Sequence, residues 1–184
     1  MLGAGAVFMA ALAFGVPEQL SNMAAPVSGV PAAQAAAARP DGRPQRLETS
    51  TLVIHGQGGH GQGGAEESRR KHSFTIEVAR TPRQQEIGMM YRTSMAADEG
   101  MLFPFPRPRL ASFWMLNTYI PLDLVFIDEN GRIESIISNA EPHSLEPLQS
   151  RGPVVAVLEI AGGQAEKLGL AVGDQVLHPE LPKP

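Results

Sequence analysis

The stretch that decides the fold is "LDLVFIDENGRIESIIS", residues 122–138. Two runs rich in β-branched and apolar residues flank the pair Asn130-Gly131, which is the strongest short-range signal of a β-hairpin. The signal has a steric basis, because both central residues of the favoured two-residue turn need positive φ, which Asn and Gly tolerate. The sequence therefore predicts an antiparallel hairpin at this position.

Further strand patterns lie on both sides of this hairpin. The clearest is "FTIEVA", residues 74–79, in which apolar and polar residues alternate with the period of two that a half-buried strand shows. Pro104 interrupts a later apolar run and indicates an edge strand or a bulge, since proline has no N–H to donate. We expect the remaining strands in residues 51–55, on either side of a turn at residues 106–108 within residues 100–115, in residues 153–160 and in residues 172–178.

Two short helices are predicted from capping signals. In "RTPRQQEIGMMYR" Thr81 is a good N-cap, Pro82 takes the first helical position, and Gln84 has the capping-box spacing. Helical spacing then directs three further side chains toward the core: Ile87, Met90 and Tyr91. A second short helix is predicted in "GGQAEKLGL", residues 162–170, ending at Gly169.

These patterns add up to about seven short strands and two short helices. Mostly antiparallel order with closely spaced turns predicts a mainly β fold: a small, mostly antiparallel barrel, with the two helices covering its ends. We expect one barrel domain over residues 51–178, preceded by a linker at residues 41–50 and followed by a tail at residues 179–184.

Residues 1–40 are expected to be a signal peptide or N-terminal anchor and its processing region. Residues 2–16, "LGAGAVFMAALAFGV", are apolar or glycine throughout, a length that suits a signal-peptide core and is short for a membrane span. Residues 33–35, Ala-Gln-Ala, match a cleavage pattern, although no Lys or Arg precedes Arg39. We predict a periplasmic or otherwise extracytoplasmic protein with membrane contact before processing. A retained anchor, or neither role, stays open.

Composition removes several function classes. The net charge is −4, which gives no reason to expect nucleic-acid binding, because phosphate contacts need clustered Lys and Arg. The chain has no cysteine, so thiolate metal sites, thiol nucleophiles and iron–sulfur clusters are excluded. The five histidines lack the paired spacing and further ligands that are typical of a zinc site. We expect no metal and no cofactor, and assign no catalytic residue.

The loop between two apolar runs carries the candidate ligand-binding residues. Trp114 offers an aromatic surface with one N–H donor, and convergent polar side chains near such a surface can hold sugars or peptides. The alternative is architectural: Trp114 packs in the core, and Asn117 and Asp123 satisfy backbone donors in a tight connection. The candidates in this loop are Trp114, Met115, Asn117, Thr118, Pro121 and Asp123.

Three residues outside this loop are secondary candidates. Arg92 follows the first predicted helix and could pair with Asp98 or Glu99, or bind a ligand carboxylate. Glu99 itself is a second candidate. His143 lies in a polar, proline-containing segment after a strand, where it could reach the mouth of a barrel.

Four segments together resemble one known family. They are "FTIEVARTPRQQEIGMMYR", "DEGMLFPFP", "SFWMLNTYIPLDLVFID" and "VLEI" followed by "LGLAVGDQV". In order and spacing they resemble domain-of-unknown-function family 192, a bacterial and archaeal family, over residues 52–178. The resemblance implies a small β-rich barrel that is often exported, and no established activity. The family motif usually reads Trp-Met-Lys-Asn-Thr; Leu116 replaces the lysine here, which implies poor binding of any anion that the lysine holds.

The sequence leaves three functions open. The first is an exported binding or interaction module whose 114–123 loop holds a small ligand, glycan or peptide. The second is an envelope hydrolase that uses Asp123 with a second carboxylate, because such enzymes pair two acids across a cleft. The partner acid would come from Asp98, Glu99 or Glu141, whereas Glu134 and Glu159 are expected on solvent-facing sides. The third is a structural accessory of an envelope complex.

Overall fold

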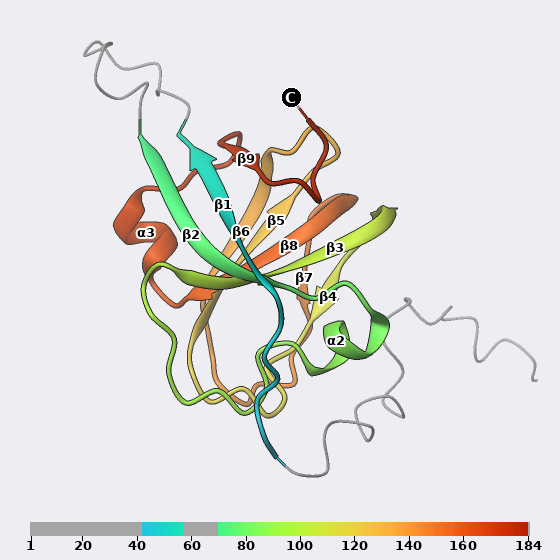
Figure 1. The fold of residues 1–184 in the computed structure, drawn as a ribbon, viewed down its shortest axis with the longest axis vertical. Coiled ribbons are helices and arrows are strands. Elements are labelled where there is room, and N and C mark those ends of the chain that lie inside the picture. Colours follow the sequence, from blue (N-terminus) through green and yellow to red (C-terminus); the bar gives the residue numbers. More distant parts are fainter. Residues whose placement is uncertain (1–41, 57–69, 184) are drawn as a thin grey trace, which may run out of the picture.

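The computed structural model describes residues 42–56 and 70–183. In this part of the chain the fold is mainly β with two short helices (Figure 1). The elements in chain order are β1 Thr49–His55, β2 Lys71–Val78, α2 Pro82–Ile87, β3 Glu99–Arg109, β4 Ser112–Phe113, β5 Leu122–Ile127, β6 Ile133–Ala140, β7 Leu148–Gln149, β8 Val154–Ala161, α3 Gln164–Leu168 and β9 Gln175–Leu177. Neither described helix has the length and apolar character needed to cross a bilayer.

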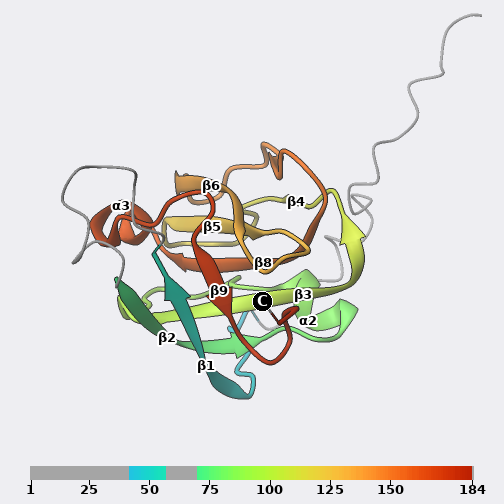
Figure 2. The same ribbon diagram turned by 90° about the horizontal axis from the view of Figure 1, so that it is seen from above.

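The main sheet has seven strands in the order β6-β5-β8-β3-β2-β1-β9 (Figure 2). Strands β4 and β7 form a separate two-stranded sheet (Figure 1). The prediction of a mostly antiparallel sheet is confirmed, with β2 and β3 as the one parallel pair among the described strands. This pair is joined by a crossover that contains α2, as parallel strands require. Sequence order alone does not reveal such a pair, since local strand signals carry no direction.

The predicted barrel is not supported, because the sheet is mixed and open. Its edge strands β6 and β9 meet through one isolated bridge, between Arg132 and Gln175, rather than through a ladder. β9 has only three residues, so its free edge offers little length for a ladder with β6. Closure of a barrel needs every edge to be paired.

Both faces of the central strands are buried. One face packs Ile76, Leu102 and Leu158 into the first apolar cluster, and the other packs Met101, Phe103 and Val157 into the second. All six residues of β5 are therefore buried. This explains why "LDLVFI" is apolar apart from Asp123: a strand covered on both sides has no solvent face to make polar.

The proline-rich segment is the clearest departure from the predicted strands. The predicted turn at residues 106–108 is wrong, since β3 runs through it as one strand from Glu99 to Arg109. The ladder with β8 shifts between Pro104 and Arg109, so the prediction of a bulge at Pro104 is confirmed. Prolines fit here because extended backbone suits their φ, and the ladder bonds that they cannot make are interrupted anyway.

The hairpin between β5 and β6 is confirmed, but its turn is not the two-residue type. Gly131 has φ 70°, whereas Asn130 is outside the positive-φ region. Asp128 organises the turn instead: its Oδ1 accepts hydrogen bonds from the backbone N–H groups of Asn130 (2.8 Å) and Arg132 (2.9 Å). A side-chain acceptor of this kind stabilises a longer turn.

Helix α2 forms as predicted and ends earlier than the apolar spacing suggests. Thr81 and Gln84 make the complete capping box. Gly88, with φ 47°, ends the helix after Ile87, so Met90 and Tyr91 lie beyond it. Met90 is still buried, while Tyr91 is partly exposed. A side chain at Gly88 would lie 3.3 Å from the Phe103 ring, which explains the glycine at this position.

Among the described glycines, Gly100 is the one at which an added Cβ would come closest to a backbone atom. A Cβ there would lie 2.6 Å from the Glu159 carbonyl oxygen and 3.1 Å from Cγ2 of Ile160. We expect Gly100→Ala to lower the free energy of unfolding by about 1–3 kcal/mol in urea denaturation, as overpacking does. Gly152→Ala is the matched control, because its Cβ would meet only Glu134 Oε1 at 3.4 Å. Equal stability of the two variants would show that β3 and β8 separate freely.

Candidate functional site

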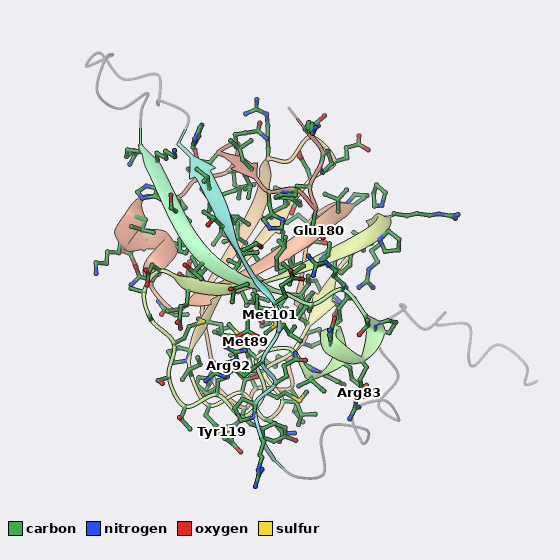
Figure 3. All side chains as sticks on the ribbon, viewed as in Figure 1. Arg83, Met89, Arg92, Met101, Tyr119 and Glu180 are labelled. Atoms are coloured by element: carbon green, nitrogen blue, oxygen red, sulfur yellow. The ribbon has the colours of Figure 1, made fainter. Side chains whose placement is uncertain are left out.

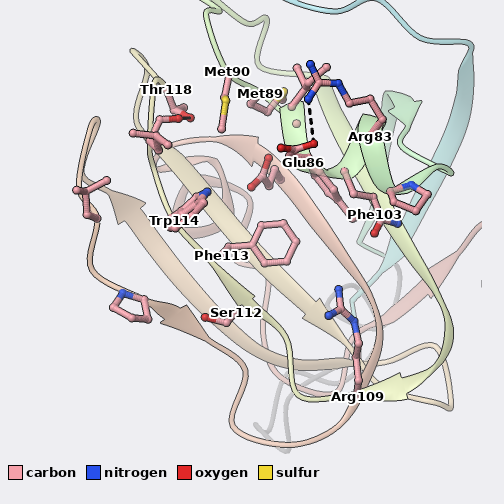
Figure 4. Close-up of a pocket in the computed structure, with 18 residues that line it drawn as sticks. Arg83, Glu86, Met89, Met90, Phe103, Arg109, Ser112, Phe113, Trp114 and Thr118 are labelled. Carbon is pink, nitrogen blue, oxygen red and sulfur yellow. Dashed lines mark hydrogen bonds and ion pairs between the residues drawn. The ribbon is translucent and has the colours of Figure 1, made fainter. Parts of the chain in front are cut away.

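A pocket of about 590 Å³ lies between α2, β4 and the loop that carries Leu145 and Pro147. Its walls are mainly aromatic, thioether and aliphatic: Met89, Met90, Phe103, Phe113, Trp114 and Leu116. Figure 4 shows Phe113 and Trp114 below Met89 and Met90, with Arg109 farther along the cavity. A concave, largely apolar space with a few polar groups is the usual form of a small-molecule site.

Trp114 directly follows β4 and is partly exposed, so the structure places it in the pocket wall. Its neighbour Phe113 packs edge to face against Phe103, with ring centroids 5.1 Å apart. Such aromatic pairs hold their rings in fixed orientation. This side of the pocket is therefore preformed, and Thr118 lines it as well.

Polar groups of the pocket come from α2 and from the end of β3. Arg83 Nη1 donates to Glu86 Oε2 at 3.0 Å, while Glu86 Oε1 is buried and has no hydrogen-bond partner. The Arg109 guanidinium lies 4.0 Å from the centroid of the Phe105 ring. Partial burial lowers the pKa of Arg109. Arg109 stays charged near neutral pH, since arginine ordinarily titrates far above it.

The most unusual group of the pocket is Glu159 on β8, which lines it while only 4% exposed. Its ladder neighbours are Met101 on β3 and Leu124 on β5, both fully buried. Burial raises the pKa of the Glu159 carboxyl to about 8, and the nearby positive charge of Arg92 opposes the shift in part. Glu159 is therefore mainly an uncharged carboxylic acid at neutral pH, a form that can donate a hydrogen bond.

Arg92 is buried, and Figure 3 labels it close to Met89, which lines the pocket. Its Nη2 donates to Glu77 Oε1 at 2.8 Å and to the Gln45 carbonyl at 3.1 Å, and its Nε is buried without a partner. Glu77 also accepts from the Leu47 N–H at 2.7 Å. The pairing of Arg92 with Asp98 or Glu99 is wrong: Arg92 joins strand β2 to the segment before β1 instead.

Asn117 and His143 lie together in a cluster outside the pocket wall. Asn117 Nδ2 donates to the Tyr91 hydroxyl at 3.2 Å, and the rings of Tyr119 and His143 have centroids 5.0 Å apart. Tyr91, Asn117 and His143 all have positive φ, between 54° and 66°. Backbone hydrogen bonds from Tyr91 to Asn117 and from His143 to Thr118 hold these three loops together.

The other sequence-predicted residues have different surroundings. Asp123 is fully buried: Oδ1 accepts from the N–H groups of Asn139 (2.8 Å) and Gly163 (2.9 Å), and Oδ2 from that of Ala165 (2.7 Å). This carboxylate joins β6 to the start of α3. Met115 is core, and Pro121 is exposed. Glu99 is exposed and accepts from the Ala96 N–H at 3.0 Å within a turn.

Sequence reasoning missed the residues that give the pocket its chemistry. Glu159 was expected on a solvent-facing side, and that expectation is wrong. One signal was present: Glu159 is the only charged residue in the apolar run "PVVAVLEI", and strands this apolar are buried on both faces. Glu86 and Phe113 carried no such signal, because either residue is ordinary on a helix surface or a short strand.

Ser50 and His178 form a hydrogen-bonded pair of the residue types that serve as nucleophile and base in hydrolases. Ser50 Oγ lies 2.7 Å from His178 Nε2, while Nδ1 accepts from the Glu180 N–H at 3.1 Å. Because Nδ1 accepts, the proton of the neutral ring is on Nε2, which donates to Ser50. Burial lowers the pKa of His178, which favours this neutral form. The ring thus cannot take the serine proton, as a catalytic base does.

Metal ligands do not gather in this molecule as far as it is described. Within residues 42–56 and 70–183, no three side chains among His, Asp and Glu come together in a way that could hold a metal ion.

Comparison with known proteins places the chain in a family without assigning a function. No curated protein matches it. A crystal structure from Sinorhizobium meliloti 1021, described as a candidate transcription regulator, is 38% identical, with 76% of this chain and 100% of that chain covered and a TM-score of 0.67. A protein of unknown function from Novosphingobium aromaticivorans DSM 12444 is 39% identical, with 78% and 96% covered and a TM-score of 0.65. The family model described as "Uncharacterized ACR" matches residues 65–178, more than half of the chain. The chain therefore belongs to domain-of-unknown-function family 192 (DUF192).

Proposed function

We propose that this protein is a binding module that holds a small, largely apolar molecule against Trp114. The observation that carries the proposal is the preformed pocket of about 590 Å³ with aromatic and thioether walls. Its volume falls within the range of known small-molecule sites, roughly 300–1,000 Å³. Thioether side chains add adaptable packing, which suits an apolar ligand.

The lining favours an apolar molecule over a glycan or a peptide. A sugar needs several convergent hydrogen-bonding groups beside an aromatic ring, and a peptide needs a groove with free backbone partners. Here Asn117 bonds Tyr91, Asp123 is occupied by backbone donors, and Leu116 adds apolar surface to the wall. The groups left for a ligand are mainly apolar.

The sequence-predicted site residues then divide by role in this proposal. Trp114 and Thr118 contact the ligand directly, as wall residues. Met115, Asp123 and Arg92 hold the surrounding frame, since each is buried within it. The hydrolase alternative receives no support from this geometry, because both oxygens of Asp123 already accept backbone hydrogen bonds and the side chain is fully buried.

The proposal includes export to an extracytoplasmic compartment, supported by the apolar run at residues 2–16. Those residues lie outside the described part of the structure. The partner is then a small molecule of the envelope rather than a nucleic acid. The description of the Sinorhizobium protein raises DNA binding as another possibility, but a net charge of −4 does not support it.

The test uses Trp114, which is the only tryptophan of the chain and so reports on the pocket alone. We expect naphthalene to change its emission, with a Kd on the order of 0.1 mM for a ligand of this size. Leu116→Lys should weaken naphthalene binding at least about tenfold, because it places the charged ammonium group of lysine in an apolar wall.

Leu110→Lys is the matched control, since Leu110 is 64% exposed and does not line the pocket. Naphthalene should bind this variant as it binds the unmodified protein. Unchanged Trp114 emission up to the solubility limit of naphthalene, or equal weakening in both lysine variants, would contradict pocket binding.

A further inference from the structure

We propose that the pocket selects small aromatic molecules carrying a hydrogen-bond acceptor, and that the buried carboxyl of Glu159 on the pocket wall donates a hydrogen bond to that acceptor. The inference rests on the proposed function and deepens it, because it assigns the polar feature that the ligand must have. It concerns a residue that neither the family match nor the similar structures assign to any role.

The geometry of Glu159 points to a partner that is missing from the folded chain. Its side chain is 4% exposed, and the little surface that it keeps faces the pocket. Its carboxyl makes no hydrogen bond to any of residues 42–56 and 70–183. A buried donor without an acceptor costs free energy, so buried polar groups are nearly always paired. A ligand atom in the pocket is the partner that the site can still receive.

The neighbours of Glu159 give its carboxyl no ion-pair partner, which favours its uncharged form. Arg92 is the cation whose field reaches the carboxyl, but its Nη2 already binds Glu77. No ion pair joins Arg92 to Glu159 itself, and the strand neighbours Met101 and Leu124 are apolar. The charged groups on the elements packed around Glu159 include Glu77 on β2, Arg83 and Glu86 on α2, Arg92 after α2, Glu99, Arg107 and Arg109 on β3, and Asp123 on β5.

The protonation state decides which ligand class fits. A protonated carboxyl favours a neutral acceptor, such as a ring nitrogen or a carbonyl oxygen. A cation would instead require the proton to leave, so that its affinity would rise with pH through the titration of Glu159. The affinity for a neutral acceptor should change in the opposite direction. The sign of the pH dependence therefore separates these two classes of ligand.

Three probes of nearly the same two-ring shape test this. Naphthalene has no acceptor, quinoline has one ring nitrogen, and N-methylquinolinium is a permanent cation. Their Kd values are measured on the full chain by Trp114 emission and by saturation-transfer NMR at about pH 6.5 and about pH 9.5, on either side of the Glu159 pKa. At the lower pH we expect quinoline to bind about tenfold more tightly than naphthalene, the usual effect of one hydrogen bond. At the higher pH this preference should vanish.

Two substitutions of Glu159 separate its role as a hydrogen-bond donor from the titration of its carboxyl. Glu159→Gln keeps an N–H donor that does not titrate, so the preference for quinoline should persist at both pH values. Glu159→Leu removes the donor, so quinoline and naphthalene should bind equally while naphthalene binding survives. Glu129→Gln, at an exposed turn position, should behave as the unmodified protein does. If the leucine variant does not fold, the glutamine variant still tests the pH dependence.

Each other outcome overturns the inference in a recognisable way. Equal binding of quinoline and naphthalene at both pH values would remove the role of Glu159 and leave the apolar pocket standing. Tightest binding of N-methylquinolinium, increasing with pH, would make Glu159 an anchor for cations instead. Failure of all three probes to bind would overturn the proposed function itself.

Discussion

Replacing Glu159 with Gln should remove a large pH-dependent loss of stability between about pH 5 and about pH 9. Burial raises the pKa of this carboxyl in the folded chain from 4.5 to about 8. Between these values the folded chain keeps a proton that the unfolded chain has released. The contribution of Glu159 is therefore complete below about pH 4.5, is lost as the pH rises to about 8, and stays constant above that.

The expected size of the effect is several kcal/mol across that window, since one pKa unit corresponds to about 1.4 kcal/mol. The measurement is the free energy of unfolding in urea at about pH 5, 7 and 9, a range that brackets the raised pKa. The unmodified protein should lose stability as the pH rises, and Glu159→Gln should lose much less. The test compares how the free energy of unfolding changes with pH, not its absolute value. The introduced glutamine is itself a buried amide, and any hydrogen bond that it lacks lowers the stability equally at every pH.

Glu129→Gln serves as the control for this measurement, because Glu129 is an exposed side chain in the β5–β6 turn. Its stability should follow that of the unmodified protein at every pH. Parallel curves for Glu159→Gln and the unmodified protein would show that Glu159 titrates normally in the fold. Water would then have to reach the floor of the pocket.

Replacing Asp123 with Ala should lower the free energy of unfolding by about 3–5 kcal/mol, since three buried backbone donors would lose their acceptor. These donors are the N–H groups of Asn139, Gly163 and Ala165, all within 2.9 Å of the carboxylate. Helix α3 has no side-chain cap of its own at Gly163. The carboxylate of Asp123 supplies that cap from β5, so α3 should detach first.

Urea denaturation measures the stability, and amide hydrogen exchange at Ala165 locates the damage. Asp98→Ala is the control, because Asp98 is exposed and its backbone carbonyl, rather than its side chain, accepts from Thr75. A loss for Asp123→Ala no greater than that of the control would mean that water replaces the carboxylate at the three donors. Asp123 would then become available again as a ligand-binding or catalytic group.

Features that depend on a few neighbouring residues were predictable from the sequence. The capping box of Thr81 and Gln84, the end of α3 at Gly169 and the β5–β6 hairpin all formed as expected. Each is fixed by local sterics and by hydrogen bonds that reach only a few residues along the chain. Even the hairpin shows the limit, since the side chain of Asp128, rather than the Asn-Gly pair, set the turn type.

The candidate site was only partly predictable. Trp114 and Thr118 line the pocket, and their place beside an apolar run was visible in the sequence. Glu159 and Glu86 join them from β8 and α2, elements far away along the chain. From the sequence, Asp123 was equally suited to bind a ligand or to accept backbone hydrogen bonds. The three backbone N–H groups that it accepts from lie 16 to 42 residues away along the chain.

The sequence by itself determined most of the strands, the start of α2, the end of α3 and the family, because these depend on local propensity and on patterns that the chain carries in order. Only the tertiary structure decided that β2 and β3 run parallel, that the sheet stays open, and that both faces of β8 are covered. The last of these gives Glu159 its chemistry. A carboxyl has a raised pKa only when segments distant in sequence exclude water from it, and no local pattern encodes that exclusion.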